Sequence, residues 1–403
     1  MRSFLAVVVG KTARFLLRLV RRGGGSALPG TLAALIDPQL LKRAIDSAPA
    51  GLVVVSGSAG KSSTTKILVA LLQAHGLKVF TNPSTANIKQ GLYAAILQFS
   101  DLRGRIDSDI VVLEWDEGHG ASLAHQLKPD LAVITNVLSD QLDRFIDPEV
   151  VTEKLAAISK SSKRVVLNFD DRNLTQIADF SNTVGFSLGD QVTANRPSYA
   201  MNFGPHAHPA AQVIVTSVSP GCVKLTLAGE SVEIATSFDS THEVMNIAAA
   251  ITALAELVEP DLEVVSNTIH GLPPVFARNE LVEIRGRQVR LMLVQNPTSF
   301  ALNLAELDGS ESPLMLMAGA DIHDPSWLWT VDFSKLEKVD VVGGRNAHEL
   351  ALRLTYQGVA IGQVAVEADE AAEAFLALPG ENPTILFSAD AMRRTRRYLG
   401  LAK

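Results

Sequence analysis

Cysteine is almost absent from this sequence, since Cys222 is the only one among 403 residues. A single cysteine rules out an internal disulfide and a four-cysteine metal site. We therefore predict that the chain binds no zinc. The low cysteine content also fits a cytoplasmic protein.

The sequence also lacks an excess of positive charge. Its formal net charge is -7 and its isoelectric point is near 5.8, so no general binding to nucleic acid is expected, because that requires a basic face. The first apolar run ends before Lys11, which makes it too short for a secretion signal or a membrane-spanning helix.

The first 22 residues nevertheless mix apolar side chains with basic ones at Lys11, Arg14, Arg18, Arg21 and Arg22. As a helix, this segment is basic and amphipathic, and it can lie on anionic lipid at the cytoplasmic face of a membrane. The alternative is a helix that docks on the main domain and leaves its basic residues in solvent.

Apolar residues are abundant, at 47% of the chain against 20% charged residues. This balance suits an α/β enzyme with a buried parallel sheet. A length of 403 residues is sufficient for two or three domains.

The chain is organised around a glycine loop that follows the valine run 53–55 and precedes an apolar helical pattern. The loop residues are Gly57, Ser58, Ala59, Gly60, Lys61, Ser62 and Ser63. A loop of this kind between a strand and a helix holds phosphate with its backbone N–H groups and with the positive end of the helix. Lys61 is expected to reach the outer phosphates, and Ser62 or Ser63 to offer an oxygen to Mg²⁺.

The loop is shorter than the full P-loop pattern, because Val55 stands where that pattern has glycine. A structural turn is the alternative interpretation. Acidic residues then follow the apolar run 110–113, beginning with Glu114 and Asp116. Carboxylates at the end of such a strand can hold the Mg²⁺ that neutralises phosphate charge, while ordinary loop acids are the simpler explanation.

Four successive apolar strands, near 78–80, 109–113, 131–134 and 165–167, end in polar or acidic residues. This pattern predicts an α/β fold in which a doubly wound parallel sheet carries its active residues along one edge. Alternating residues between 213 and 234 predict antiparallel strands. Strands after residue 260, with a hairpin from Leu281 to Val294 over Arg285-Gly286-Arg287, predict a smaller C-terminal α/β domain.

The predicted domains are an N-terminal basic helix and extension at 1–45, a central ATP-binding domain at 46–260, and a C-terminal domain at 261–403. Within the central domain, residues 193–235 form an irregular or β insert. Its His206 and His208 have no cysteine partners, which also argues against zinc.

Together these segments resemble the Mur ligase family. The loop from Gly57 to Ser62 is similar to the family's G-T-N-G-K-T, and Glu114 to Glu117 resembles its E-x-D-E segment. Thr135-Asn136 with residues 140–144 resembles T-N-x-x-x-D-H-x-D, and residues 168–171 resemble N-x-D-D. This implies a P-loop central domain with a Mur-ligase-like fold.

Other segments are similar to the MurT-type branch of that family. Asp140 to Phe145 matches D-Q-x-D-R-[FY], and Asp324 to Phe333 is close to D-x-S-W-[IL]-[WY]-D-x-D-F. The chain departs from this branch in two places. The insert at 193–235 stands where the branch has a four-cysteine zinc ribbon, and Ala318 to Asp321 replaces the usual N-D-N.

The resemblance implies specific roles. Catalytic residues would be Asp324 and Lys61. ATP-binding residues would be Gly57, Ser58, Ala59, Gly60, Lys61, Ser62, Ser63, Asn168, Asp170, Asn246 and Arg278. Magnesium ligands would be Ser62 and Glu114. Substrate contacts would come from Asn87, Asp116, Asp140 and Arg144.

The implied reaction is ATP-dependent amidation of the D-glutamate carboxylate in the lipid II stem peptide, through an acyl phosphate. The ammonia would come from a GatD-like class I glutaminase, whose catalytic histidine Asp324 would orient; a structural cap before Pro325 is the alternative role. Two other functions stay open, namely a stand-alone Mur-type ligase that joins an amino acid to a carboxylate, and a non-catalytic scaffold.

Overall fold

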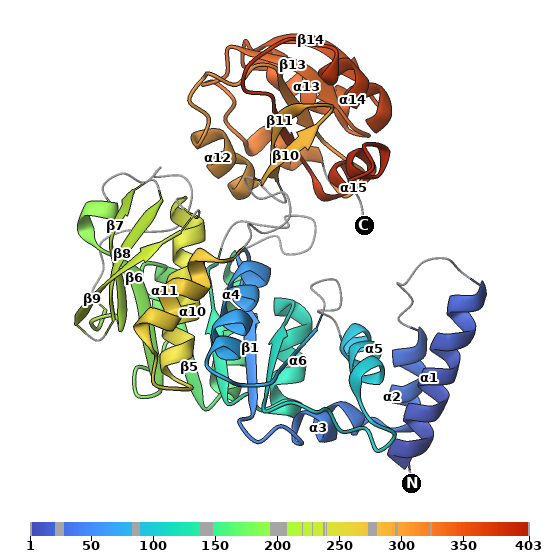
Figure 1. Ribbon diagram of the computed structural model, residues 1–403, viewed down its shortest axis with the longest axis vertical. Helices are drawn as coiled ribbons and strands as arrows, with labels where there is room; N and C mark the ends of the chain where they lie inside the picture. Colours follow the sequence, from blue (N-terminus) through green and yellow to red (C-terminus); the bar gives the residue numbers. More distant parts are fainter. Residues whose placement is uncertain are drawn as a thin grey trace. The chain divides into compact units, whose positions relative to one another are not determined.

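The computed structural model describes residues 2–20, 28–82, 89–137, 148–193, 208–219, 221–227, 229–236, 238, 240–272, 280–294, 297–322 and 325–401. These residues divide into two compact units (Figure 1). The first holds elements α1 to α11, and the second holds β10 to α15. Each unit is an α/β structure with its own sheet, as the sequence predicts.

The first unit begins with a group of packed helices: α1 (Arg2–Val20), α2 (Leu28–Ile36), α3 (Leu40–Ile45) and, later in the chain, α5 (Lys89–Phe99). Glycines allow close approach, because a Cβ at Gly10 would lie 2.6 Å from the Leu97 side chain and one at Gly30 would lie 2.3 Å from the Gln90 carbonyl oxygen. The α1 helix lies at the edge of this unit, with α2 between it and α5 (Figure 1).

A nine-stranded sheet forms the core of the first unit, in the order β2-β3-β1-β4-β5-β6-β7-β8-β9. Its strands are β1 (Leu52–Ser56), β2 (Val79–Thr81), β3 (Ile110–Glu114), β4 (Leu131–Ile134), β5 (Arg164–Asn168), β6 (Thr183–Leu188), β7 (Val213–Ser219), β8 (Cys222–Leu227) and β9 (Glu230–Ala235). Strands β2 to β7 are parallel, and β8 and β9 add on in antiparallel fashion. The predicted doubly wound parallel sheet is thus confirmed.

Helices cover this sheet, and consecutive residues of its central strands are therefore all buried. The helices are α4 (Lys61–Ala74), α6 (Glu117–Leu127), α7 (Pro148–Ser161), α8 (Arg172–Gln176), α9 (Asp190–Thr193), α10 (Thr241–Ala255) and α11 (Leu262–His270). The α10 helix is buried from Glu243 to Leu254 and packs against α4, which fixes the helix that follows the glycine loop. The first unit extends to Leu272.

The second unit has a six-stranded sheet in the order β10-β11-β15-β12-β13-β14. Its strands are β10 (Glu280–Ile284), β11 (Arg287–Leu293), β12 (Leu314–Met317), β13 (Lys338–Gly343), β14 (Ala360–Ala365) and β15 (Thr384–Phe387). Its helices are α12 (Pro297–Ala305), the 3₁₀ helix η2 (Pro325–Thr330), α13 (Ala347–Tyr356), α14 (Ala368–Leu376) and α15 (Ala389–Tyr398). All strand pairs are parallel except the β10–β11 hairpin.

The predicted hairpin is confirmed, but its turn is one residue shorter than predicted, because Arg287 is the first residue of β11. Arg285 and Gly286, its two central residues, have positive φ angles of 51° and 79°, as a two-residue turn between twisted strands requires. The Arg285 side chain then reaches α14, where both of its terminal nitrogens donate to the Glu373 carboxylate. Tyr398 also donates its hydroxyl to Glu373, at 2.6 Å.

These donors make the titration of Glu373 a test of the hairpin's position. Hydrogen bonds from Arg285 and Tyr398 lower the pKa of this carboxyl from an ordinary 4.5 to about 2. The hydrogen bonds to Glu373 therefore stabilise the folded protein when the pH is above the ordinary pKa. This stabilisation is lost as the pH falls through the lowered pKa that Glu373 has in the folded protein. We expect carboxyl NMR to give a midpoint near the lowered pKa, and Arg285→Ala to return it toward the ordinary one. Arg287→Ala is the matched control, because Arg287 donates only to the Leu378 and Gly380 carbonyls among its described bonds. Equal midpoints in wild type and Arg285→Ala would contradict this assignment.

Candidate nucleotide-binding site

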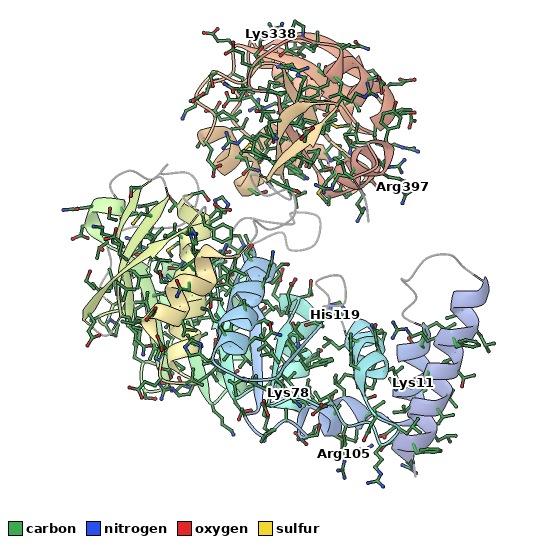
Figure 2. The ribbon with its side chains drawn as sticks, in the orientation of Figure 1. Lys11, Lys78, Arg105, His119, Lys338 and Arg397 are labelled. Carbon is green, nitrogen blue, oxygen red and sulfur yellow. The ribbon has the colours of Figure 1, made fainter. Side chains whose placement is uncertain are left out.

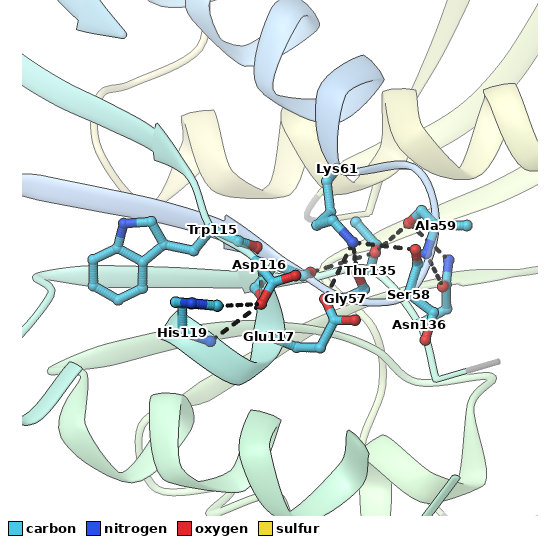
Figure 3. Close-up of polar contacts among 11 residues, drawn as sticks. Gly57, Ser58, Ala59, Lys61, Trp115, Asp116, Glu117, His119, Thr135 and Asn136 are labelled. Atoms are coloured by element: carbon cyan, nitrogen blue, oxygen red, sulfur yellow. Dashed lines mark hydrogen bonds and ion pairs between the residues drawn. The ribbon is translucent and has the colours of Figure 1, made fainter. Parts of the chain in front are cut away.

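The glycine loop lies at the carboxyl edge of the central strands of the first sheet. Strand β1 has β3 on one side and β4 on the other, with Val55 opposite Glu114 and Ser56 opposite Ile134. All three strands are parallel, so the loop after β1, the acidic segment after β3 and the polar segment after β4 meet at one edge (Figure 3).

The loop begins at Gly57, because Val55 is still a buried residue of β1. Gly57 and Gly60 both have positive φ angles, of 131° and 82°. A Cβ at Gly57 would lie 2.3 Å from the Thr135 hydroxyl, and one at Gly60 would lie 2.2 Å from the Asn246 side-chain oxygen. Both positions therefore need glycine for conformation and for space, which supports the shorter loop that the sequence predicts.

Two residues after β4 hold the loop in place. The Asn136 carbonyl accepts from the Ser58 N–H at 3.0 Å, and its side-chain oxygen accepts from the Ala59 N–H at 2.9 Å. The Ala59 carbonyl accepts from the Thr135 hydroxyl at 2.6 Å and from the Asn136 side-chain amide at 3.2 Å. The paired Thr135 and Asn136 thus act as a clamp that fixes the backbone of the loop.

This clamp leads to a prediction for Asn136. The Asn136→Ala variant keeps the backbone bond to Ser58 but loses both side-chain bonds to Ala59. Because such bonds contribute about 1 kcal/mol each, the loop becomes less ordered, and we expect ATP to bind about tenfold more weakly. Isothermal titration calorimetry with a non-hydrolysable ATP analogue measures this. Asn182→Ala, which removes two side-chain bonds elsewhere in this unit, should bind normally, and unchanged affinity in Asn136→Ala would contradict the clamp.

Lys61 opens α4 and folds back over the loop. Its ammonium donates to the Gly57 carbonyl, to the Ser58 carbonyl at 3.2 Å, and to the Glu117 carboxylate at 3.2 Å. The side chains of Lys61 and Glu117 are 13% and 3% exposed, so this ion pair is largely shielded from water. A shielded cation beside the amino end of a helix is suited to hold phosphate oxygens.

The acidic segment after β3 has a defined structure. Glu114 is buried, and its backbone N–H and carbonyl pair with the Asn82 side chain at 2.9 and 3.2 Å. Asp116 caps α6 by accepting from the His119 N–H at 3.1 Å, and the same oxygen lies 3.1 Å from the His119 ring nitrogen. The structure therefore brings the predicted Glu114 and Asp116 to the edge that carries the loop, where Figure 3 labels Asp116.

A magnesium site fits this edge chemically. Ser62 lies in the first turn of α4, and Glu114 ends β3 beside β1. A hydroxyl and a carboxylate are oxygen ligands of the kind Mg²⁺ takes, and Mg²⁺ keeps several waters, so it does not need a full protein cage. The described residues contain no group of three or more His, Cys, Asp or Glu side chains that could hold a metal ion.

The other predicted nucleotide residues fall in two places. Asn246 of α10 lies beside the loop and accepts from the Thr64 hydroxyl at 3.2 Å, and Ser63 is buried in α4. Asn168 and Asp170 lie at the end of β5. There, Asn168 accepts from the Asp170 N–H at 3.1 Å, and Asp170 accepts from the Leu188 N–H at 2.8 Å.

Five of the predicted site residues lie outside the part of the chain that the structure describes. They are Asn87, Asp140, Arg144, Arg278 and Asp324. The structure also adds residues to which the sequence motifs assigned no role, namely Thr135 and Asn136 in the clamp and Glu117 as the partner of Lys61. The sequence did offer one signal for these three residues, because they lie inside the T-N and E-x-D-E segments that resemble family motifs.

Comparisons with known proteins place this site in a family. Residues 55–254 match the Mur ligase middle domain, and residues 293–392 match the MurT ligase C-terminal domain. The lipid II isoglutaminyl synthase (glutamine-hydrolyzing) subunit MurT of Streptococcus pneumoniae is 27% identical over 401 residues, which cover 89% of this chain and 88% of the relative. The subunit of the same name from Staphylococcus aureus is 26% identical over 408 residues, which cover 92% and 91%.

Solved structures show the same fold. A pseudomurein peptide ligase type C from Methanothermus fervidus aligns with a TM-score of 0.69 and 17% identity, over 90% of this chain and 80% of its own. MurF ligase from Thermotoga maritima in complex with ADP aligns with a TM-score of 0.68 and 21% identity, over 90% and 82%. With the glycine loop and both matched domains in place, the chain belongs to the Mur ligase family, as a MurT-like ATP-dependent ligase.

Proposed function

We propose that this chain is the ligase subunit of a glutamine-dependent amidating enzyme of peptidoglycan synthesis. Its substrate would be the D-glutamate carboxylate in the stem peptide of lipid II, which becomes D-isoglutamine. The observation that carries this proposal is the presence of a Mur-type phosphate loop and a MurT-type C-terminal domain in one chain. The MurT names of the relatives cited above support it.

The loop residues have clear tasks in this proposal. The backbone N–H groups of the loop and the Lys61 ammonium hold the ATP phosphates and place the γ-phosphoryl group beside the substrate carboxylate. Ser62 and Glu114 would hold Mg²⁺, which neutralises phosphate charge when bound. Glu117 keeps the Lys61 ammonium over the loop, because it accepts from that group on the side of α6.

The reaction would proceed in two transfers. A substrate carboxylate oxygen takes the γ-phosphoryl group, and ADP leaves. Ammonia then attacks the acyl carbon, the C–O bond to the phosphate breaks, and the nitrogen loses a proton to give the amide. Water must be kept away between these transfers, because the acyl phosphate hydrolyses.

The ammonia would come from a partner. The word subunit in the names of the relatives implies an assembly, and we propose that the partner here is a GatD-like class I glutaminase. Asp324 would complete the partner's catalytic site by orienting its histidine. Because lipid II is membrane-bound, the enzyme would work at the cytoplasmic face of the membrane.

Reconstitution tests the whole proposal. The chain is purified with a class I glutaminase and supplied with lipid II, ATP, Mg²⁺ and glutamine, and the stem peptide is analysed by mass spectrometry. We expect an amide in place of one carboxylate, formed only when ATP and either glutamine or ammonium are present. No amidated product with both subunits present would overturn the proposal. ATP hydrolysis that depends on an added amino acid instead would indicate a stand-alone ligase.

A further inference from the structure

The outer face of α1 is apolar although it is exposed. Phe4, Leu5, Phe15 and Leu16 are each between 51% and 63% exposed. Positions 4, 5, 8, 9, 12, 15 and 16 fall on one side of an α-helix. All are apolar except the exposed Thr12, and Val8 and Val9 are half-buried, so the helix presents to solvent an apolar stripe that Thr12 interrupts.

The opposite face of α1 already has its partners. Ala6, Val7 and Gly10 are buried, and α1 packs against α2 and α5. The Lys11 ammonium donates to the Ser100 carbonyl at 2.6 Å, which ties the helix to the end of α5. The stripe is thus the exposed side of a docked helix, on which Figure 2 labels Lys11.

Exposed apolar side chains are concentrated in this region. Eight of the fifteen large exposed apolar residues in the described part of the chain belong to α1, α2 or the end of α5 and its following loop. Besides the four on α1, they are Leu28, Leu35, Phe99 and Leu102. Single exposed apolar residues are ordinary, but the repetition of exposed apolar residues along one face of α1 indicates an interaction site.

The charge of this region indicates what that site binds. The first 36 residues contain six Arg or Lys residues and no Asp or Glu, although the whole chain carries a net charge of -7. Arg103 and Arg105, in the loop after α5, are also exposed, and a Cβ at Gly104 between them would lie 2.5 Å from Leu40 and 3.7 Å from Val7 on the buried face of α1. An apolar helix face on a segment with an excess of positive charge suits the surface of a bilayer that contains anionic phospholipid.

We propose that α1 docks this chain on an anionic lipid bilayer, with its stripe in the boundary between headgroups and acyl chains. The helix would lie along the surface, because no described helix is long and apolar enough to cross a membrane. The contact between α1 and lipid does not depend on the proposed function. Only the link between this contact and a lipid-linked substrate rests on the proposed function.

Vesicle flotation with the full chain tests the contact without ATP or lipid II. We expect the protein to float with vesicles of phosphatidylcholine and phosphatidylglycerol at low salt, and to float less with phosphatidylcholine alone or at high salt. The Phe4→Ser/Phe15→Ser variant should bind at least about tenfold more weakly. Because both side chains are exposed, its thermal unfolding should match that of the wild type.

A matched control removes exposed apolar side chains elsewhere. Phe180 and Leu281 are 44% and 68% exposed, outside the N-terminal helices, so Phe180→Ser/Leu281→Ser should float like the wild type. Failure of the wild type to float with anionic vesicles, or equal losses in both variants, would overturn the proposal. So would a wild-type dimer that Phe4→Ser/Phe15→Ser turns into a monomer with unchanged flotation, because the stripe would then be an interface between two copies.

A second measurement separates this proposal from the proposed function. If amidation is confirmed, Phe4→Ser/Phe15→Ser should slow it with lipid II in vesicles but not with a short-chain, water-soluble analogue. An equal rate on both substrates would overturn the link to catalysis. Flotation without any amidation would leave the docking surface standing and would overturn only the proposed reaction.

Discussion

Replacing Lys61 by methionine is expected to lower ATP-dependent amidation by a factor of about a thousand. Lys61 is the cation that the structure places over the glycine loop, shielded from water with Glu117. Methionine keeps an unbranched side chain that is one atom shorter, but it removes the charge that would meet the phosphate oxygens. Loss of one well-placed charged donor from a shielded site lowers a rate by about 10²–10³-fold, and weaker ATP binding adds to this loss.

The ion pair between Lys61 and Glu117 indicates which control the Lys61→Met variant needs. In Lys61→Met the Glu117 carboxylate, which is 3% exposed, loses its cationic partner. We expect the free energy of unfolding to fall by roughly 1–3 kcal/mol for that reason. The double variant Lys61→Met/Glu117→Gln replaces the carboxylate by a neutral amide and should recover much of that loss.

The two variants separate catalysis from folding. Amidation is followed by mass spectrometry with ammonium as the nitrogen source, and unfolding is followed by circular dichroism. Both variants should be inactive, although the double variant is the more stable of the two. Activity that returns together with stability would show that Lys61 acts only as a structural partner of Glu117.

Much of this site could be predicted from the sequence because it lies on regular elements. An apolar strand, a loop with two glycines and an apolar helix specify a phosphate loop, and parallel strands must end at the same edge. Gly57, Lys61, Glu114 and Asp116 lie at that edge for this reason, while their roles in binding ATP, metal and substrate stay predictions. The shortness of the loop also followed from Val55, which the structure shows as a buried residue of β1.

The roles of the remaining polar residues could not be predicted in the same way. Asp170 accepts from the backbone of β6, and the fully buried Asp171 accepts from the Val137 N–H at 2.7 Å. A carboxylate that joins strand ends has the same sequence pattern as one that faces a ligand. The clamp by Asn136 and the pairing of Glu117 with Lys61 depend on contacts between segments far apart in the sequence, so only the fold reveals them.

The second expected result concerns Asp324, which would serve the supply of ammonia and not the binding of ATP. We propose that its carboxylate orients the catalytic histidine of a glutaminase partner. A carboxylate in that position fixes the histidine tautomer and stabilises the imidazolium that forms during catalysis, and its amide replacement costs about 10⁴-fold in a triad hydrolase. We therefore expect Asp324→Asn to lower glutamine-driven amidation of lipid II by about 10³–10⁴-fold.

Ammonium-driven amidation distinguishes this role from a structural one. Because Asp324 would act only on the partner's histidine, Asp324→Asn should keep the wild-type rate when ammonium chloride replaces glutamine, whereas Lys61→Met should be inactive with both. Asp308→Asn is the matched control, since Asp308 accepts from the Ser310 N–H in an exposed loop of the second unit, and it should change neither rate. If Asp324→Asn lowers both rates together, the residue supports the ligase itself, as a cap before Pro325 would, and the proposed contribution to the partner's active site is wrong.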